Sequence, residues 1–140
     1  MSESFGVRTT VRGYEVDTTG HLTQAVYLQY GEHARWECLR AAGITQDRLI
    51  ASGVGPVQLE LTLRFLRELR SGDEVVVSCE FLWREGKTFQ IRQEYVRADG
   101  TPAATLTGVC GLLDLERRQL VTDPRGRLHA LALVPEVMNL

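Results

Sequence analysis

The sequence lacks the features that would place it in a membrane or on a nucleic acid. No apolar run approaches the roughly 20 residues that a membrane-spanning helix needs. The segment Met1–Gly6 lacks the basic and apolar regions of a signal peptide, and a formal net charge of -2 provides no broad basic surface for phosphate backbones. These absences predict a cytoplasmic protein that binds neither a membrane nor a nucleic acid.

Cysteine and histidine are also scarce. Cys38, Cys79 and Cys110 are odd in number, far apart and flanked by apolar or helix-forming residues, which is typical of buried thiols. A metal site would need closely spaced Cys or His pairs, and the three histidines show no such spacing with one another or with a cysteine. We therefore expect no metal site and no cofactor.

The hydrophobic pattern of this 140-residue chain predicts one domain that begins with a strand and a long helix. Ser4–Tyr14 carries β-branched residues and is the expected first strand. Glu15–Thr23, rich in turn-forming residues, is the expected loop. The helix is expected from Gln24 or Ala25 to Ala42, because Thr23 is a plausible N-cap, no proline follows, and Gly43 suits the C-terminal end.

Four further strands are predicted after a helical turn and loop over Thr45–Gly55. Apolar and polar residues alternate there with a period of two, and turn signals such as Asp99-Gly100 separate the segments. Connections this short make the sheet an antiparallel meander. Leu128–Val134 is expected to be a short helix or a packed cap. The four strands are expected at Val57–Phe65, Glu74–Arg84, Thr88–Arg97 and Pro102–Leu115.

The order of these elements predicts an α+β fold. A helix of about 17 residues is roughly 25 Å long, comparable with the width of a five-stranded sheet. A five-stranded antiparallel sheet wrapped around one long central helix is the hotdog fold, and the pattern alone leaves a ferredoxin-like or cystatin-like arrangement open. One helix leaves part of the sheet uncovered, so we expect a homodimer or homotetramer.

Asp17 is the strongest catalytic candidate. It lies in a short polar loop just before the long helix, whose start offers partial positive charge and backbone N–H donors without internal partners. Such donors can stabilise a developing oxyanion, while a nearby carboxylate attacks a carbonyl or activates water. From position alone, a structural role in the turn is the commoner reading, since Asp is a frequent turn residue.

The motif around Asp17 resembles a known family. The run Val11–Tyr30, continuing through Glu32–Leu39, is similar to the signature of the 4-hydroxybenzoyl-CoA thioesterase-like acyl-CoA and acyl-ACP thioesterases. The likeness extends less strongly through Leu59–Asp73. This resemblance implies a hotdog fold, a cytoplasmic oligomer and the hydrolysis of an acyl thioester at sites formed between paired subunits.

The resemblance also implies roles for individual residues. Asp17 matches the acid that serves as nucleophile or general base, and the backbone N–H of Gln24 matches the donor that polarises the thioester carbonyl. Tyr27 matches a tyrosine near the acyl pocket. His21 matches the histidine of the family's Gly-His-hydrophobic-Asn-Asn motif. This sequence has Thr23 and Gln24 where the motif has its two asparagines, which changes the reach of the substrate contacts. His21, Thr23 and Tyr27 are therefore the expected substrate-binding residues.

Other readings stay open at this point. Glu32 and Glu37 rival Asp17 as catalytic acids, but an arginine three residues after each favours surface ion pairs. An enoyl-thioester hydratase or dehydratase would need an Asp and His pair, which keeps His21 in view. A non-catalytic acyl-binding protein is the third alternative. The expected lining of an apolar acyl chamber is Tyr27, Tyr30, Phe65, Phe81 and Trp83.

Overall fold

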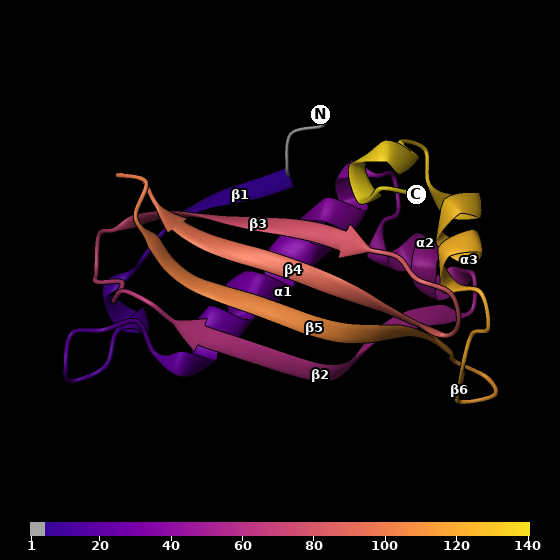
Figure 1. Ribbon diagram of the computed structural model, residues 1–140, viewed down its shortest axis with the longest axis horizontal. Coiled ribbons are helices and arrows are strands. Elements are labelled where there is room, and N and C mark those ends of the chain that lie inside the picture. Colours follow the sequence, from indigo (N-terminus) through magenta and orange to yellow (C-terminus); the bar gives the residue numbers. More distant parts are fainter. Residues whose placement is uncertain (1–4) are drawn as a thin grey trace.

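The computed structural model describes residues 5–140, so Ser4 of the expected first strand lies outside it. Within that range, five long antiparallel strands curl around the helix α1 (Gln24–Ala41), as Figure 1 shows. This is the predicted hotdog fold. The strands are β1 (Phe5–Thr10), β2 (Val54–Phe65), β3 (Glu74–Leu82), β4 (Thr88–Arg97) and β5 (Pro102–Asp114), and they lie in the order β1-β3-β4-β5-β2.

The strand order corrects the expected meander. Strands β3, β4 and β5 are neighbours as predicted, but β2 lies at the opposite edge of the sheet from β1 and pairs with β5. The connection 66–73 from β2 to β3 is therefore no hairpin turn, and it runs across one end of the sheet beside the start of α1 (Figure 1). Leu69 is fully buried there, and its carbonyl accepts a 2.8 Å hydrogen bond from the Leu22 N–H.

Both ends of α1 lie close to their predicted positions. Thr23 has the extended backbone of an N-cap residue, but its hydroxyl makes no capping hydrogen bond. At the other end, Ala41 is the last helical residue, and Gly43 adopts a φ of 88°. A left-handed φ favours glycine, which explains why the helix ends here.

Short elements complete the described chain. The helix α2 fulfils the expectation of a helical turn after α1. The short helix expected over Leu128–Val134 is also present, but α3 begins earlier, at Pro124, and ends at Leu131. A 3₁₀ helix replaces the expected end of the first strand at Tyr14, and the brief strand β6, paired with β5, was not predicted. No helix within residues 5–140 combines the length and apolar character needed to cross a membrane. These elements are η1 (Gly13–Glu15), α2 (Gln46–Ala51), β6 (Gln119–Leu120), α3 (Pro124–Leu131) and η2 (Pro135–Met138).

A β-bulge interrupts the alternation predicted for β2. The register against β5 shifts between Gln58 and Glu60, so Leu59 is an extra residue in β2. The side chains before Leu59 therefore lie on the opposite face of the sheet from the one that simple alternation predicts. Gln58 pairs with Cys110 across the strands, and although Gln58 is exposed, its Oε1 lies 3.1 Å from the Sγ of Cys110. The apolar residues before and after the bulge therefore do not share one face, contrary to the simple alternation.

Two buried polar side chains of β4 hold α1 against the sheet. The Gln93 amide donates a 2.9 Å hydrogen bond to the Gly31 carbonyl, and the Tyr95 hydroxyl donates a 2.6 Å hydrogen bond to the Tyr27 carbonyl. Arg35 donates to Gln93 Oε1 at 2.9 Å. A Cβ atom on Gly31 would lie only 2.7 Å from the Tyr95 hydroxyl, so this close approach depends on glycine.

We expect Gly31→Ala to destabilise the protein although alanine favours helices. Overpacking a core costs about 1–3 kcal/mol, against a propensity gain of about 1 kcal/mol, and the Cβ also strains two buried hydrogen bonds. The expected net loss is about 1 kcal/mol or more in urea unfolding. Adding Tyr95→Phe removes the clashing oxygen and should make Gly31→Ala less costly than it is in the wild-type background. A Gly31→Ala variant more stable than wild type would contradict this packing.

Candidate active site

The loop before α1 is a tight turn that its own backbone closes. The Asp17 N–H donates to the His21 carbonyl at 2.9 Å, and the Gly20 N–H donates to the Asp17 carbonyl at 3.0 Å. Val16 and Leu22 form an isolated antiparallel bridge at the base of the turn. Gly20 has a φ of 85°, which suits glycine. The turn thus fixes the backbone of Asp17 beside the start of the helix.

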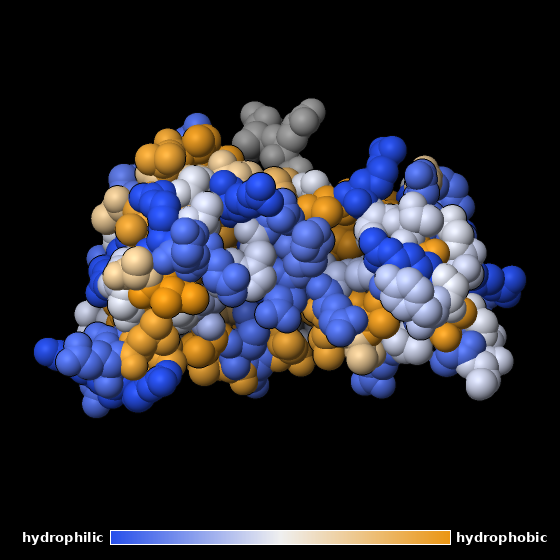
Figure 2. Space-filling view, turned by 180° about the vertical axis from the view of Figure 1, so that it is seen from behind, coloured by the Kyte–Doolittle hydropathy of each residue, from blue (hydrophilic) through white to orange (hydrophobic). Residues whose placement is uncertain are grey.

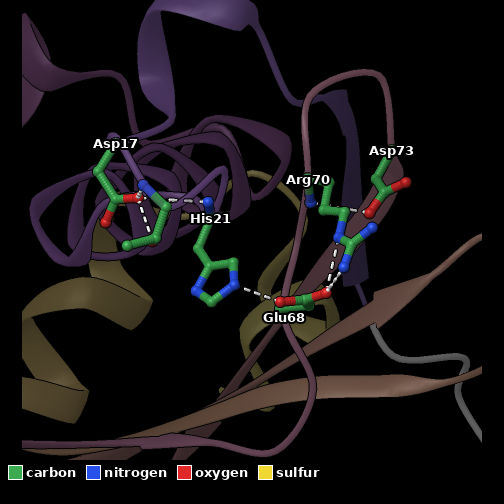
Figure 3. Close-up of polar contacts among 6 residues, drawn as sticks. Asp17, His21, Glu68, Arg70 and Asp73 are labelled. Carbon is green, nitrogen blue, oxygen red and sulfur yellow. Dashed lines mark hydrogen bonds and ion pairs between the residues drawn. The ribbon is translucent and has the colours of Figure 1, made fainter.

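The Asp17 carboxylate is held through one of its two oxygens. Oδ1 accepts from the Thr19 hydroxyl at 2.5 Å, the Thr19 N–H at 2.9 Å and the His21 N–H at 3.3 Å (Figure 3). The hydrogen bonds from Thr19 and His21 lower the pKa of Asp17, which favours its ionised form. Oδ2 accepts no hydrogen bond from the residues that the structure describes, so it is available for chemistry.

The start of α1 supplies free donors. Because Thr23 makes no side-chain cap, the backbone N–H groups of Gln24 and Ala25 have no acceptor within residues 5–140. The first N–H groups of a helix also carry the positive end of its dipole. This is the arrangement that can stabilise negative charge on a carbonyl oxygen.

Four of the five predicted site residues line one open cavity of about 740 Å³, including its mouth. They are Asp17, His21, Gln24 and Tyr27, whereas Thr23 is half-buried and contributes no lining. The remaining lining comes from Leu22 and from the end of β2 and the connection after it: Phe65, Leu66, Arg67 and Glu68. Of this second group, the sequence pointed only to Phe65, as an expected acyl-chamber residue. Residues 66–68 were not expected here, because the wrongly expected β2–β3 hairpin hid the path of residues 66–73 beside α1.

Glu68 is an acidic residue of this cavity that the sequence did not point to. Its carboxylate forms an ion pair with the His21 ring, and its other oxygen accepts from Arg70 (Figure 3). Its segment, Arg-Glu-Leu-Arg-Ser-Gly-Asp, belongs to the region of weaker family resemblance. That resemblance was the available signal, but it assigns Glu68 no role.

The five aromatic residues expected in one acyl chamber lie on different cavities. Tyr27 and Phe65 share the Asp17 cavity and pack edge to face, with ring centroids 5.0 Å apart. Burial is the main cause of the raised pKa of Tyr27. Phe81 lines a separate cavity under α1, and Tyr30 and Trp83 line two more. The structure therefore brings only Tyr27 and Phe65 to the Asp17 cavity, whereas Phe81 and Trp83 stack on each other elsewhere, with ring centroids 5.8 Å apart.

The two rival acids on α1 lie outside the Asp17 cavity. Glu37 pairs with Arg40 at 3.6 Å, as expected. Glu32 makes no such pair with Arg35, whose guanidinium instead contacts Gln93. Glu32 lies at the cavity under α1, whose volume is about 490 Å³ including its mouth. Neither acid is near the unpaired donors of the helix start.

Glu15 is a buried acid beside the Asp17 loop. It is 8% exposed, and its Oε1 accepts from the Tyr30 hydroxyl at 2.5 Å and from the Arg12 N–H at 2.9 Å. Burial raises the pKa of Glu15, but these hydrogen bonds and the Arg12 guanidinium outweigh it, and the pKa falls below its usual range. Because the Glu15 carbonyl also accepts from the Thr23 N–H at 3.0 Å, this cluster ties the loop to the helix start.

The three cysteines are free and buried, as predicted. Burial raises the pKa of the Cys110 thiol to about 11, which makes it a poor nucleophile. Within residues 5–140, no group of three His, Cys, Asp or Glu side chains could hold a metal ion.

Comparison with known proteins identifies the family. Residues 11–139 match the Thioesterase-like superfamily, and the chain belongs to it. A relative is the chloroplastic acyl-acyl carrier protein thioesterase ATL3 of Arabidopsis thaliana, 46% identical over 56% of this chain and 42% of ATL3. Another, the L-carnitine dehydrogenase/betainyl-CoA thioesterase of Agrobacterium fabrum, is 27% identical over 86% of this chain and 25% of its own. The chain thus spans less than half of either relative.

Solved structures share the fold. A hypothetical protein of Thermus thermophilus, TT1821, superposes with a TM-score of 0.80 at 29% identity, covering 92% of this chain and 97% of its own. The Staphylococcus aureus protein SAV2348, solved in complex with CoA, superposes with a TM-score of 0.82 at 18% identity, covering 99% and 87%. The latter likeness supports the fold alone.

We expect Glu15 to make stability depend on pH in the acid range. Since its folded pKa is lowered, its contribution is complete above the unfolded value of about 4.3 and is lost as pH falls through the folded value. Glu15→Gln should lower the free energy of unfolding at pH 7 by about 1–3 kcal/mol, the scale of charged hydrogen bonds. The difference from wild type should shrink at pH 3 in urea titrations. An equal difference at both pH values would refute the linkage, and Glu116→Gln in an exposed turn is the control.

Proposed function

We propose that this protein hydrolyses the thioester of an acyl-CoA or an acyl-ACP to a free acid and a thiol. The observation that carries the proposal is the meeting of an ionised Asp17 carboxylate and the unpaired N–H donors of the α1 start in one cavity. Membership of the Thioesterase-like superfamily supports it, as do relatives named as thioesterases of acyl-ACP and betainyl-CoA.

The chemistry follows from the two oxygens of Asp17. With Oδ1 held by three donors, Oδ2 either attacks the thioester carbon or takes a proton from the attacking water. The Gln24 N–H polarises the carbonyl and stabilises the oxyanion. When the carbon–sulfur bond breaks, the thiolate leaves and takes up a proton. Water supplies the oxygen of the new acid, directly or by hydrolysing an Asp17 acyl anhydride.

His21 and Tyr27 complete the proposed substrate contacts. Both line the Asp17 cavity, and the edge-to-face pair of Tyr27 with Phe65 provides an apolar wall for the acyl group. Thr23 acts on the substrate less directly, because it lies outside the lining and its carbonyl accepts from the Val26 N–H.

A panel of acyl-CoAs and acyl-ACPs with a free-thiol reagent tests the reaction. Hydrolysis releases a thiol. A hydratase would instead change the enoyl absorbance without releasing thiol, and a binding protein would do neither. Absence of thiol release across the panel would overturn the proposal.

Asp17→Asn separates catalysis from a structural role. We expect the kcat of thiol release to fall by about a hundredfold or more, because a positioned acid-base group is lost. The KM should change little, since the group acts after binding. Asn keeps an oxygen for the Thr19 and His21 donors, so the thermal midpoint should stay near that of wild type. The controls are Glu32→Gln and Glu37→Gln; loss of activity in a control, with Asp17→Asn active, would move the acid to the helix.

We further propose that the chain works as a homodimer or homotetramer. Three apolar side chains at the edge strand β2 are exposed: Leu59 at 48%, Leu61 at 40% and Phe65 at 54%. In Figure 2, hydrophobic residues gather along the lower border, where Figure 1 places β2. Such a patch beside unpaired strand edges favours association. Phe65 also lines the Asp17 cavity, so a second copy on this edge would help to close the site.

Light scattering at micromolar concentration tests the oligomer. We expect a mass of two or four chains for wild type and a shift toward the monomer for Leu59→Arg, because a charge within the patch would be buried on association. Leu82→Arg, at a comparably exposed leucine at the end of β3, is the control and should keep the wild-type mass. A monomeric wild-type protein would contradict the proposal.

A further inference from the structure

Two contacts attach the Asp17 loop to the β2–β3 connection. In the first, the Leu22 N–H donates to the carbonyl of the fully buried Leu69 at 2.8 Å. In the second, the His21 Nε2 forms an ion pair with Oε2 of Glu68 (Figure 3). Residues 21–22 therefore face residues 68–69. Leu22 and Leu69 meet through their backbones, and His21 and Glu68 meet through their side chains.

Glu68 is itself fixed from the other side. While Oε2 faces His21, Oε1 accepts from the Arg70 Nε at 2.6 Å. The backbone N–H of Arg70 donates to Oδ2 of Asp73 at 2.9 Å, which closes the turn before β3. Figure 3 shows this chain of contacts running from Asp17 through His21 and Glu68 to Arg70 and Asp73. The Glu68 carboxylate is thereby oriented before it meets His21.

His21 connects this chain to the catalytic acid. Its backbone N–H donates to Oδ1 of Asp17 at 3.3 Å, while its ring is held by Glu68. The side chains of His21 and Glu68 are 48% and 34% exposed, so the pair is a surface ion pair and contributes little to stability. The pair can instead act on the geometry of the Asp17 loop, because small displacements of a catalytic group are costly for catalysis.

We propose that Glu68 is a positioning residue of the hydrolysis: it holds the His21 ring, and through the His21 peptide it keeps the Asp17 carboxylate aimed at the thioester. This inference rests on the proposed function. It gives the β2–β3 connection a part in catalysis that goes beyond lining the cavity.

Glu68→Ala and Glu68→Gln test the inference. Glu68→Ala should reduce kcat by about tenfold or more with a KM near that of wild type, because the ground-state pocket survives while the acid is less well aimed. Glu68→Gln keeps an oxygen that accepts from the His21 ring and should stay within about threefold of wild type. Glu74→Ala removes an exposed acid at the start of β3 and serves as the matched control, with unchanged kinetics.

A double-mutant cycle identifies the path of the effect. If Glu68 acts through His21, His21→Ala combined with Glu68→Ala should be no slower than His21→Ala alone. Thermal midpoints of all variants should lie close to that of wild type. The inference fails if Glu68→Ala has wild-type kcat, changes KM alone, loses activity only through unfolding, or adds fully to His21→Ala. Failure of the proposed function looks different, because wild type would then release no thiol or Asp17→Asn would retain full activity.

Discussion

The placement of α1 depends on two hydrogen bonds that its own backbone accepts from β4. The Gly31 and Tyr27 carbonyls already lie within the helix, and each takes an additional donor from a fully buried side chain, Gln93 or Tyr95. Buried donors of this kind are costly to leave unpaired, so sliding the helix along the sheet would be strongly unfavourable. Since α1 is rigid, fixing its middle also fixes the position of its first turn at Gln24.

The first turn of α1 is left incomplete at the point where chemistry is proposed. Thr23 occupies the N-cap position without capping, and the N–H groups of Gln24 and Ala25 remain free. A side-chain cap would satisfy a donor and stabilise the helix by about 1 kcal/mol. That stabilisation is absent here, and the Glu15 carbonyl instead secures the segment through the Thr23 N–H. The loop is thus held by contacts that leave the helix donors accessible.

Local sequence signals predicted most helices and strands well, because the formation of a helix or strand depends largely on residues that are neighbours in the sequence. The helix from Gln24 and its end at Gly43 followed from the hydrophobic period, the turn residues and the glycine. Asp17 became the catalytic candidate from its place before the helix together with the family resemblance, and that role stays a prediction. The β2–β3 path could not be predicted in this way, because a short polar turn looks the same whether its strands pair or separate. Glu68 was missed for that reason. The bulge at Leu59 was also hidden, since one extra residue leaves the local composition unchanged.

Burial separates the residues that maintain the fold from those proposed to act on substrate. Gln93 and Tyr95 are fully buried and Glu15 is nearly so. Water competes little with their hydrogen bonds, so the loss of these bonds should be seen in the free energy of unfolding. Asp17 and His21 are exposed, and their contacts exchange with water at little cost to stability. The two sets meet where the Glu15 backbone holds Thr23, one residue before the free donors of α1. The buried residues can therefore form a rigid frame that carries the exposed acid. For such an acid, catalysis depends on its precise geometry and not on its contribution to stability.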